Sequence, residues 1–114
     1  MKESKIIITI SLDEKNVPEK IYWEATNADF KGKKNSRTLM LSLWDSEEAM
    51  TYSIDLWTKD MTVDNMNLHY HQIFIKMAET FERSTKNSEA VSMIRDFSSK
   101  FAKKLELNPD SRKS

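Results

Sequence analysis

Residues 55–83, DLWTKDMTVDNMNLHYHQIFIKMAETFER, contain the clearest change of pattern in the chain. The alternation of apolar and polar residues that is typical of a strand stops at Trp57 and Thr58. Within a few residues it gives way to apolar residues at three- and four-residue steps, which is the spacing of an amphipathic helix. This change predicts a sheet in the N-terminal half and, after it, helices that cover one side of the sheet.

Four segments of alternating pattern are expected to be strands, and they lie at residues 5–13, 20–26, 37–45 and 49–57. β-branched residues dominate the first segment, and Pro18 marks the turn that follows it. The polar stretch 27–36 holds the only glycine and is expected to be an exposed loop. Strands that follow one another without intervening helices favour an antiparallel sheet, here made of two hairpins.

The apolar positions of the second hairpin predict its register. In its first strand they are the odd-numbered Leu39, Leu41 and Leu43, whereas in its second strand they are the even-numbered Met50, Tyr52, Ile54 and Leu56. Only a pairing of odd with even positions, such as Leu43 with Tyr52 and Leu41 with Ile54, places both sets on one face.

The opposite face of this hairpin would then be neither cleanly polar nor cleanly apolar, because it collects Met40, Trp44, Thr51, Ser53, Asp55 and Trp57. Methionine suits adaptable binding surfaces, and two tryptophans are more than a solvated face needs. Two helices can cover only one face of a sheet, so the other must be solvated, capped by a second subunit or bound to a partner. We take Met40, Trp44, Thr51 and Trp57 as the candidate surface for a protein partner or for self-association into a homo-oligomer.

Two helices are expected at residues 62–85 and 88–107, with Thr62 and Ser88 as their N-caps. The fold class is therefore α+β, with a four-stranded antiparallel sheet followed by two C-terminal helices packed on one face. A chain of 114 residues suffices for one modest core, and we expect a single domain over residues 1–109. Residues 110–114 are expected to form a disordered tail.

Composition argues against several classes of partner. The 18 basic and 18 acidic residues cancel, which gives no general attraction to nucleic acid or to an anionic membrane. The chain has no cysteine, which excludes disulfides and thiolate chemistry within it. The N-terminus lacks the long apolar run of a signal peptide, and no window suits insertion into a membrane, so a cytoplasmic location is expected.

Residue types that could support catalysis or metal binding do not assemble into a known pattern. His69 and His71 are two positions apart on a predicted helix, which points them to opposite sides, whereas a chelating pair needs a spacing of four. Asp55 lies between apolar residues, and an ion pair with Lys59 is the expected explanation. We therefore expect no enzymatic activity, no cofactor and no metal site.

Several segments, taken in order, resemble one family of small bacterial proteins. They are residues 55–61 (DLWTKDM) and 77–83 (MAETFER), supported by 17–21 (VPEKI), 41–45 (LSLWD) and 94–97 (IRDF). Over about residues 5–107 the chain resembles the GldC family, which is associated with gliding motility in the Bacteroidota. The resemblance implies a non-enzymatic accessory protein that contacts other components of the gliding machinery. Family members tend to have a glycine where this chain has Lys86, so we expect the turn between the helices to differ here.

Four strands followed by two helices is also the element order of the bacterial export chaperone SecB. A SecB-like chaperone or holdase that binds unfolded or secreted clients is therefore the alternative to an accessory or adaptor protein.

Overall fold

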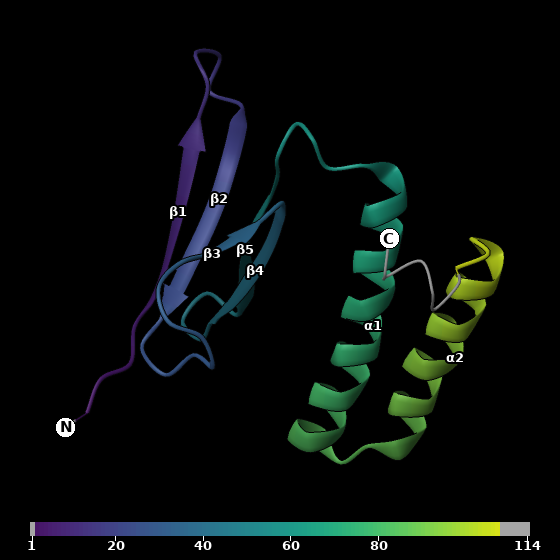
Figure 1. Cartoon of the computed structure of the whole chain (residues 1–114). Coiled ribbons are helices and arrows are strands. Elements are labelled where there is room, and N and C mark those ends of the chain that lie inside the picture. The colour runs from purple at the N-terminus through teal and green to yellow at the C-terminus, as the bar shows by residue number, and fades with distance from the viewer. Residues whose placement is uncertain (1, 108–114) are drawn as a thin grey trace. The chain divides into compact units, whose positions relative to one another are not determined.

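The structure, a computed structural model, describes residues 2–107, which form five strands and two helices (Figure 1). The strands are β1 (Ile6–Leu12), β2 (Pro18–Ala25), β3 (Lys34–Ser36), β4 (Thr38–Asp45) and β5 (Met50–Trp57). The helices are α1 (Val63–Thr85) and α2 (Ser88–Lys104). The expectation of an α+β protein with two C-terminal helices is confirmed. The tail expected at 110–114 lies outside the described residues.

The described residues divide into two compact units, with the boundary between Met61 and Thr62. The first, the sheet unit, holds all five strands, and the second, the helical unit, holds both helices. Two expectations stay predictions. One is a single domain over residues 1–109, and the other is the packing of the helices on one face of the sheet.

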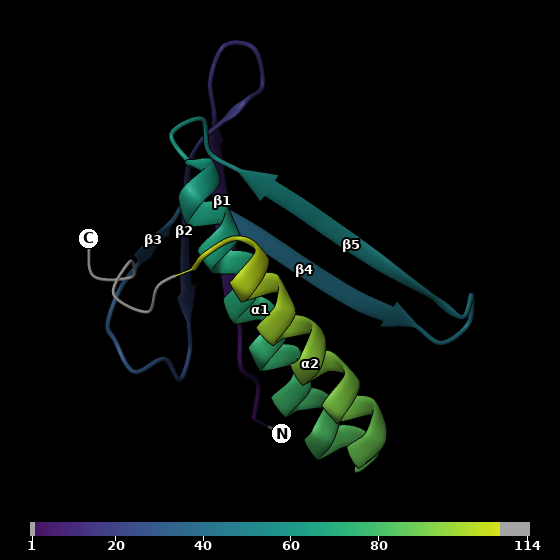
Figure 2. The ribbon, with the colours of Figure 1, turned by 90° about the vertical axis from the view of Figure 1, so that its right-hand side faces the viewer.

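The expectation of one four-stranded sheet is wrong. The strands form a three-stranded sheet in the order β1-β2-β3 and a separate two-stranded sheet of β4 and β5. The short strand β3 lies inside the stretch that was expected to be a loop. Figure 2 shows β4 and β5 running off at an angle to β1 and β2. The chain therefore changes sheets at Arg37, the single residue between β3 and β4.

The length of β2 explains why the two sheets do not merge. β2 and β3 pair with Ile21 opposite Ser36, and at that register Pro18, where β2 begins, would lie opposite Leu39. Most of β4 thus extends beyond the start of β2, and proline has no N–H to donate to a ladder. Beyond Arg37 the chain pairs with β5 alone.

The small core of the sheet unit lies in the three-stranded sheet. β1 and β2 pair antiparallel, with Ile10 opposite Ile21 and Ile8 opposite Trp23. Ile21 has only 2% of its surface exposed, and Trp23 packs edge-on against Phe30 with ring centroids 5.0 Å apart. The pairing places Ile21 and Trp23 on the same face as Ile8 and Ile10 of β1.

Both hairpins are closed by the same turn chemistry. In the first, Asp13 Oδ1 accepts hydrogen bonds from the backbone N–H groups of Lys15 and Val17, at 2.8 and 3.0 Å. In the second, Asp45 Oδ1 accepts from the N–H groups of the next two glutamates, at 2.9 and 3.0 Å. Each turn ends in a residue with positive φ, which is Asn16 (63°) in one and Ala49 (53°) in the other. An aspartate side chain that bonds to nearby backbone favours such turns.

The helical unit is a hairpin of α1 and α2. Phe74 of α1 lies edge-on to both Phe97 and Phe101 of α2, with centroids 5.1 Å apart in each pair. The side chain of Thr62 caps α1, as expected, but the N-cap of α2 is Asn87, whose Oδ1 accepts from the N–H of Ala90 at 3.1 Å. The prediction of Ser88 as that cap was wrong by one residue.

The turn between the helices is built on a residue in the left-handed conformation. Lys86 has a φ of 57°, and its N–H donates to the carbonyl of Glu82 at 3.0 Å. Glycine is the usual residue in this conformation at a helix C-terminus. A lysine here adopts the same backbone at some cost in strain.

Candidate interaction surface

The four residues of the candidate surface lie on one face of the β4–β5 hairpin. The predicted register is confirmed, with Leu41 opposite Ile54 and Leu43 opposite Tyr52. It follows that Trp44 is opposite Thr51 and that Met40 is opposite Asp55. We call the side of the hairpin formed by the even positions of β4 and the odd positions of β5 the tryptophan face. The opposite side, which carries the leucines of β4, is the leucine face.

The tryptophan face is a strip with an aromatic ring at each end. Trp57 is opposite Thr38, at the start of β4, and Trp44 lies near the end of that strand. Positions 38 and 44 are six residues apart, or about 20 Å at the rise of an antiparallel strand. The two side chains are 59% and 65% exposed, and Met40 lies on the strip between them. The structure therefore brings Trp44 together with Thr51, but it does not bring the two tryptophans together.

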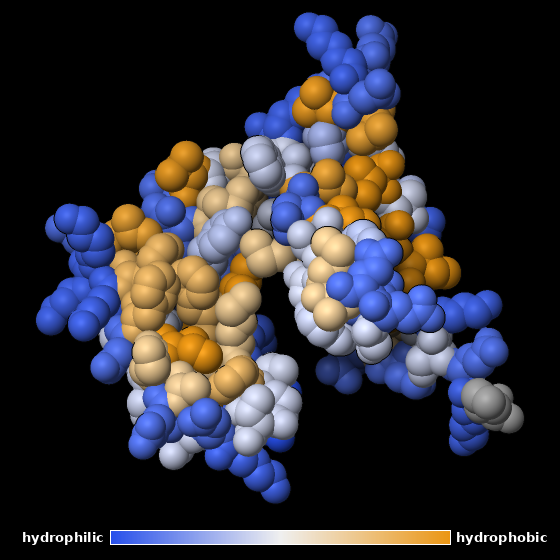
Figure 3. All heavy atoms as spheres, turned by 180° about the vertical axis from the view of Figure 1, so that it is seen from behind, coloured by the Kyte–Doolittle hydropathy of each residue, from blue (hydrophilic) through white to orange (hydrophobic). Residues whose placement is uncertain are grey.

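No third strand within residues 2–107 pairs with this hairpin. Leu43, Tyr52 and Ile54, which share the leucine face as predicted, each have about half of their surface or more exposed. The hairpin thus presents apolar side chains on both sides. The helical unit has its own apolar groove, of about 510 Å³, lined by Ile73, Lys76, Met77, Thr80, Phe81, Ser84 and Ile94. In Figure 3 apolar side chains gather on the sheet unit and, separately, on the helical unit.

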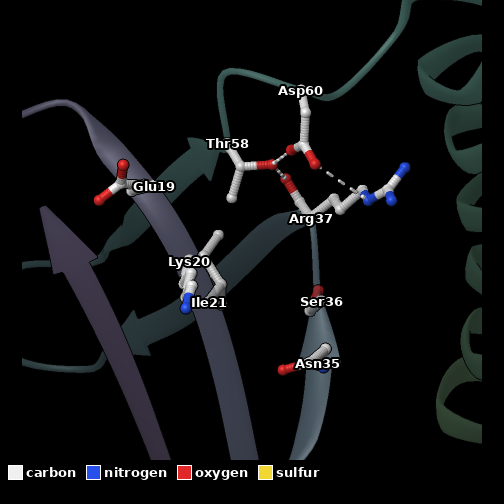
Figure 4. A pocket seen from close by; sticks show the side chains of 8 residues that line it. All are labelled: Glu19, Lys20, Ile21, Asn35, Ser36, Arg37, Thr58 and Asp60. Carbon is white, nitrogen blue, oxygen red and sulfur yellow. Dashed lines mark hydrogen bonds and ion pairs between the residues drawn. The ribbon is translucent and has the colours of Figure 1, made fainter. Parts of the chain in front are cut away.

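At the bend between the two sheets, a polar cluster ties the chain together (Figure 4). Thr58 is 2% exposed, and its hydroxyl donates to the carboxylate of Asp60. Its backbone N–H donates to the carbonyl of Arg37 at 2.8 Å, and Arg37 Nε lies 3.5 Å from Asp60 Oδ2. The hydrogen bond from Thr58 and then the charge of Arg37 hold the pKa of Asp60 below its usual value.

A hollow of about 290 Å³ adjoins this cluster and is lined by Glu19, Lys20, Ile21, Asn35, Ser36, Arg37, Thr58 and Asp60. Its polar groups come from three separate segments, which sequence reasoning did not connect. The spacing of Thr58 and Asp60, two residues apart just after a strand, is the only local signal of a side-chain turn. Because Thr58 and Arg37 both engage the Asp60 carboxylate, the cluster holds the bend in the chain.

Lys59 does not pair with Asp55, so that prediction is wrong. Its Nζ lies 2.6 Å from Asp13 Oδ2 and 4.0 Å from Glu19 Oε1. The hydrogen bond from Lys59 is the largest reason why the pKa of Asp13 falls to about 2. Lys59 thus ties the segment after β5 to the turn of the first hairpin. Among residues 2–107, Asp55 has no ion-pair partner within 4.0 Å.

Neither histidine joins a cluster of three or more potential metal ligands within residues 2–107. Burial lowers the pKa of His69, whose Nε2 is buried without a hydrogen-bond partner in the described part of the chain. Within residues 2–107 no three His, Cys, Asp or Glu side chains gather closely enough to hold a metal ion. No helix in that same range is both long enough and apolar enough to cross a membrane.

These features define a small α+β protein whose sheet unit carries an exposed hairpin with aromatic and apolar side chains. A family model described as gliding motility-associated protein GldC-like matches residues 18–107, and the chain belongs to this family. The match confirms the resemblance that the sequence segments showed. Searches of curated proteins and of solved structures find no match, and the analogy with SecB gains no support from them.

Proposed function

We propose that this gliding motility-associated protein is a non-enzymatic cytoplasmic adaptor that binds a protein component of the gliding machinery through the tryptophan face of β4–β5. The observation that supports this most is the exposure of Trp44 and Trp57 on a hairpin that pairs with no third strand within residues 2–107. Tryptophan is enriched among the residues that dominate binding energy at interfaces, because one side chain removes a large apolar area from water.

The exposed side chains of the hairpin also suit a protein partner. Seven large side chains on it are exposed, namely Met40, Leu43, Trp44, Met50, Tyr52, Ile54 and Trp57. Three of these, Met40, Trp44 and Trp57, lie on the tryptophan face, and the other four lie on the leucine face. Exposed apolar side chains gathered on one face commonly mark a site of protein contact.

The proposal is tested by capture from the native organism. A tagged chain carrying Trp44→Ser and Trp57→Ser should lose a stoichiometric partner that the wild type retains, and cells carrying the variant should glide poorly. Met93→Ser is the matched control, because Met93 is an equally apolar residue, 73% exposed, on α2 of the helical unit. Retention of the same partner by the double variant, with its circular dichroism unchanged, would show that the tryptophan face is the wrong surface.

A further inference from the structure

The outer edge of β5 has no strand beside it in residues 2–107, where β4 and β5 form a sheet of their own. Seven of the eight residues of β5 are exposed. Proteins usually protect such an edge with a proline, a lysine, a bulge or a covering segment. β5 contains neither proline nor lysine, and its register with β4 shows no bulge. An edge of this kind can accept an extended segment of another protein as an added strand.

The backbone groups that point to this edge come from the residues of β5 whose side chains lie on the tryptophan face. Because the N–H of Thr58 donates to the carbonyl of Arg37, this pair is hydrogen-bonded across the hairpin. Hydrogen-bonded and non-bonded pairs alternate along antiparallel strands, so the odd-numbered residues of β5 form the non-bonded pairs. The backbone N–H and C=O groups of Thr51, Ser53, Asp55 and Trp57 therefore point away from β4. An added strand would bond to these groups and lay its side chains along both faces of the hairpin.

The charge at this edge favours one kind of partner. Asp55 is exposed on the tryptophan face, two residues from Trp57, and Lys59 is engaged by Asp13. A lysine or arginine placed there would pair with the carboxylate and could lie over the indole ring. On the other side of the added strand, apolar residues would meet Tyr52 and Ile54, which are half exposed.

A second copy of this chain does not supply that chemistry. β5 contains no basic residue. Two β5 strands paired so that their tryptophan faces coincide would bring Asp55 of each copy onto one surface without a cation between them. Like charges directly opposite each other destabilise a pair of strands, and a register that separates the two aspartates leaves each without a cation.

We propose that the outer edge of β5 binds an extended segment of a partner protein as an additional strand, with a basic side chain over Asp55 and Trp57 and apolar side chains beside Tyr52 and Ile54. The proposal rests on the function proposed above and specifies the partner that the hairpin recognises. Main-chain hydrogen bonds hold the segment, and the alternate side chains select it.

The test uses three fluorescein-labelled peptides of alternating threonine and valine, which carry lysine, alanine or glutamate at the centre. Fluorescence anisotropy with the full chain gives the affinity of each. The lysine peptide should bind about ten-fold more tightly than the glutamate peptide, as expected for one ion pair reinforced by an aromatic ring. The alanine peptide should lie between them.

Two variants and one control separate the effect of the Asp55 charge from that of the backbone edge. Asp55→Lys should reverse the order of the peptides, whereas Glu47→Lys, the same change in the turn of the same hairpin, should leave it as in the wild type. Ser53→Pro removes an outward N–H and should weaken all three peptides about ten-fold or more without breaking a bond to β4. Thermal unfolding followed by circular dichroism checks that this variant is folded.

Binding of none of the peptides, equal affinity for lysine and glutamate peptides, or a reversal by Glu47→Lys would overturn the proposal. Such a result leaves the adaptor function in place if the Trp44→Ser, Trp57→Ser chain still loses its cellular partner. If that chain keeps its partner while the peptides bind as described, the adaptor proposal fails and the strand-accepting edge stands.

Discussion

The two β-hairpins of this protein share a turn design but differ in what surrounds them. Each turn is closed by an aspartate that accepts two backbone N–H groups, and each ends in a residue with positive φ. The β1–β2 hairpin gains a third strand, a buried isoleucine and an ion pair from Lys59 to its turn. In the part of the chain that the structure describes, the β4–β5 hairpin has none of these. An isolated two-stranded hairpin is only marginally stable in water, so we infer that β4–β5 needs an additional covering surface.

The largest expected effect comes from removing the same side chain in each hairpin. Ile21→Ala should lower the free energy of unfolding by about 2–4 kcal/mol, because Ile21 is buried and the change leaves a cavity. Ile54→Ala should cost less than about 1 kcal/mol, because half of Ile54 is already in water. Urea unfolding followed by tryptophan fluorescence measures both.

An equal cost for the two isoleucine variants would contradict the contrast between the hairpins. It would mean that the leucine face is covered in solution. The helical unit, which was expected to pack on one face of the sheet, would then be the first candidate for that cover.

The second prediction concerns the bend where the two hairpins join. Thr58→Val keeps the shape of the side chain but removes the hydroxyl that donates to Asp60, and it should destabilise the sheet unit by about 1–2 kcal/mol. Thr51→Val makes the same change on the exposed tryptophan face and should stay within about 0.5 kcal/mol of the wild type. Thermal unfolding of the two variants side by side is the measurement. A similar loss in both would show that the bend does not depend on the Thr58 hydroxyl.

Alternation of apolar residues was enough to predict the β4–β5 register and the shared face of Met40, Trp44, Thr51 and Trp57. One register places the apolar side chains of both strands on one face, and a slip by one residue would separate them. The bend at Arg37 could not be found in this way. Lys34–Ser36 show no apolar alternation, and the groups that hold the bend come from Thr58 and Asp60, about twenty residues later.

The ion pair of Lys59 was missed for a related reason. Asp55 is close to Lys59 in sequence, whereas Asp13 reaches it only because the fold brings the first turn beside the end of β5. Local spacing favours the near partner, and tertiary structure selects the distant one. That choice leaves the Asp55 carboxylate free for the partner proposed above.

The third prediction compares the last residue of each turn. Asparagine tolerates positive φ better than alanine does, because its side chain can bond to nearby backbone. Ala49→Gly should therefore stabilise the protein by about 0.5–1 kcal/mol, whereas Asn16→Gly should change the free energy of unfolding by only a few tenths of a kcal/mol. Denaturant midpoints determine the difference. Equal shifts in the two turns would mean that Ala49 is not under backbone strain in solution.

The smallest effect should appear only in acid. The pKa of Asp13 is about 2 in the folded chain, against an ordinary value of 3.8, because Lys59 donates to its carboxylate. Between those two values the unfolded chain holds more protons, so stability present above pH 4 is lost as the pH falls towards 2. Asp13→Asn and Lys59→Met should each flatten this part of the pH dependence, and the double variant should flatten it no further than either one alone. If the two effects instead add, Asp13 and Lys59 contribute to stability independently. The ion pair that distinguishes the turn of the first hairpin from that of the second would then be absent in solution.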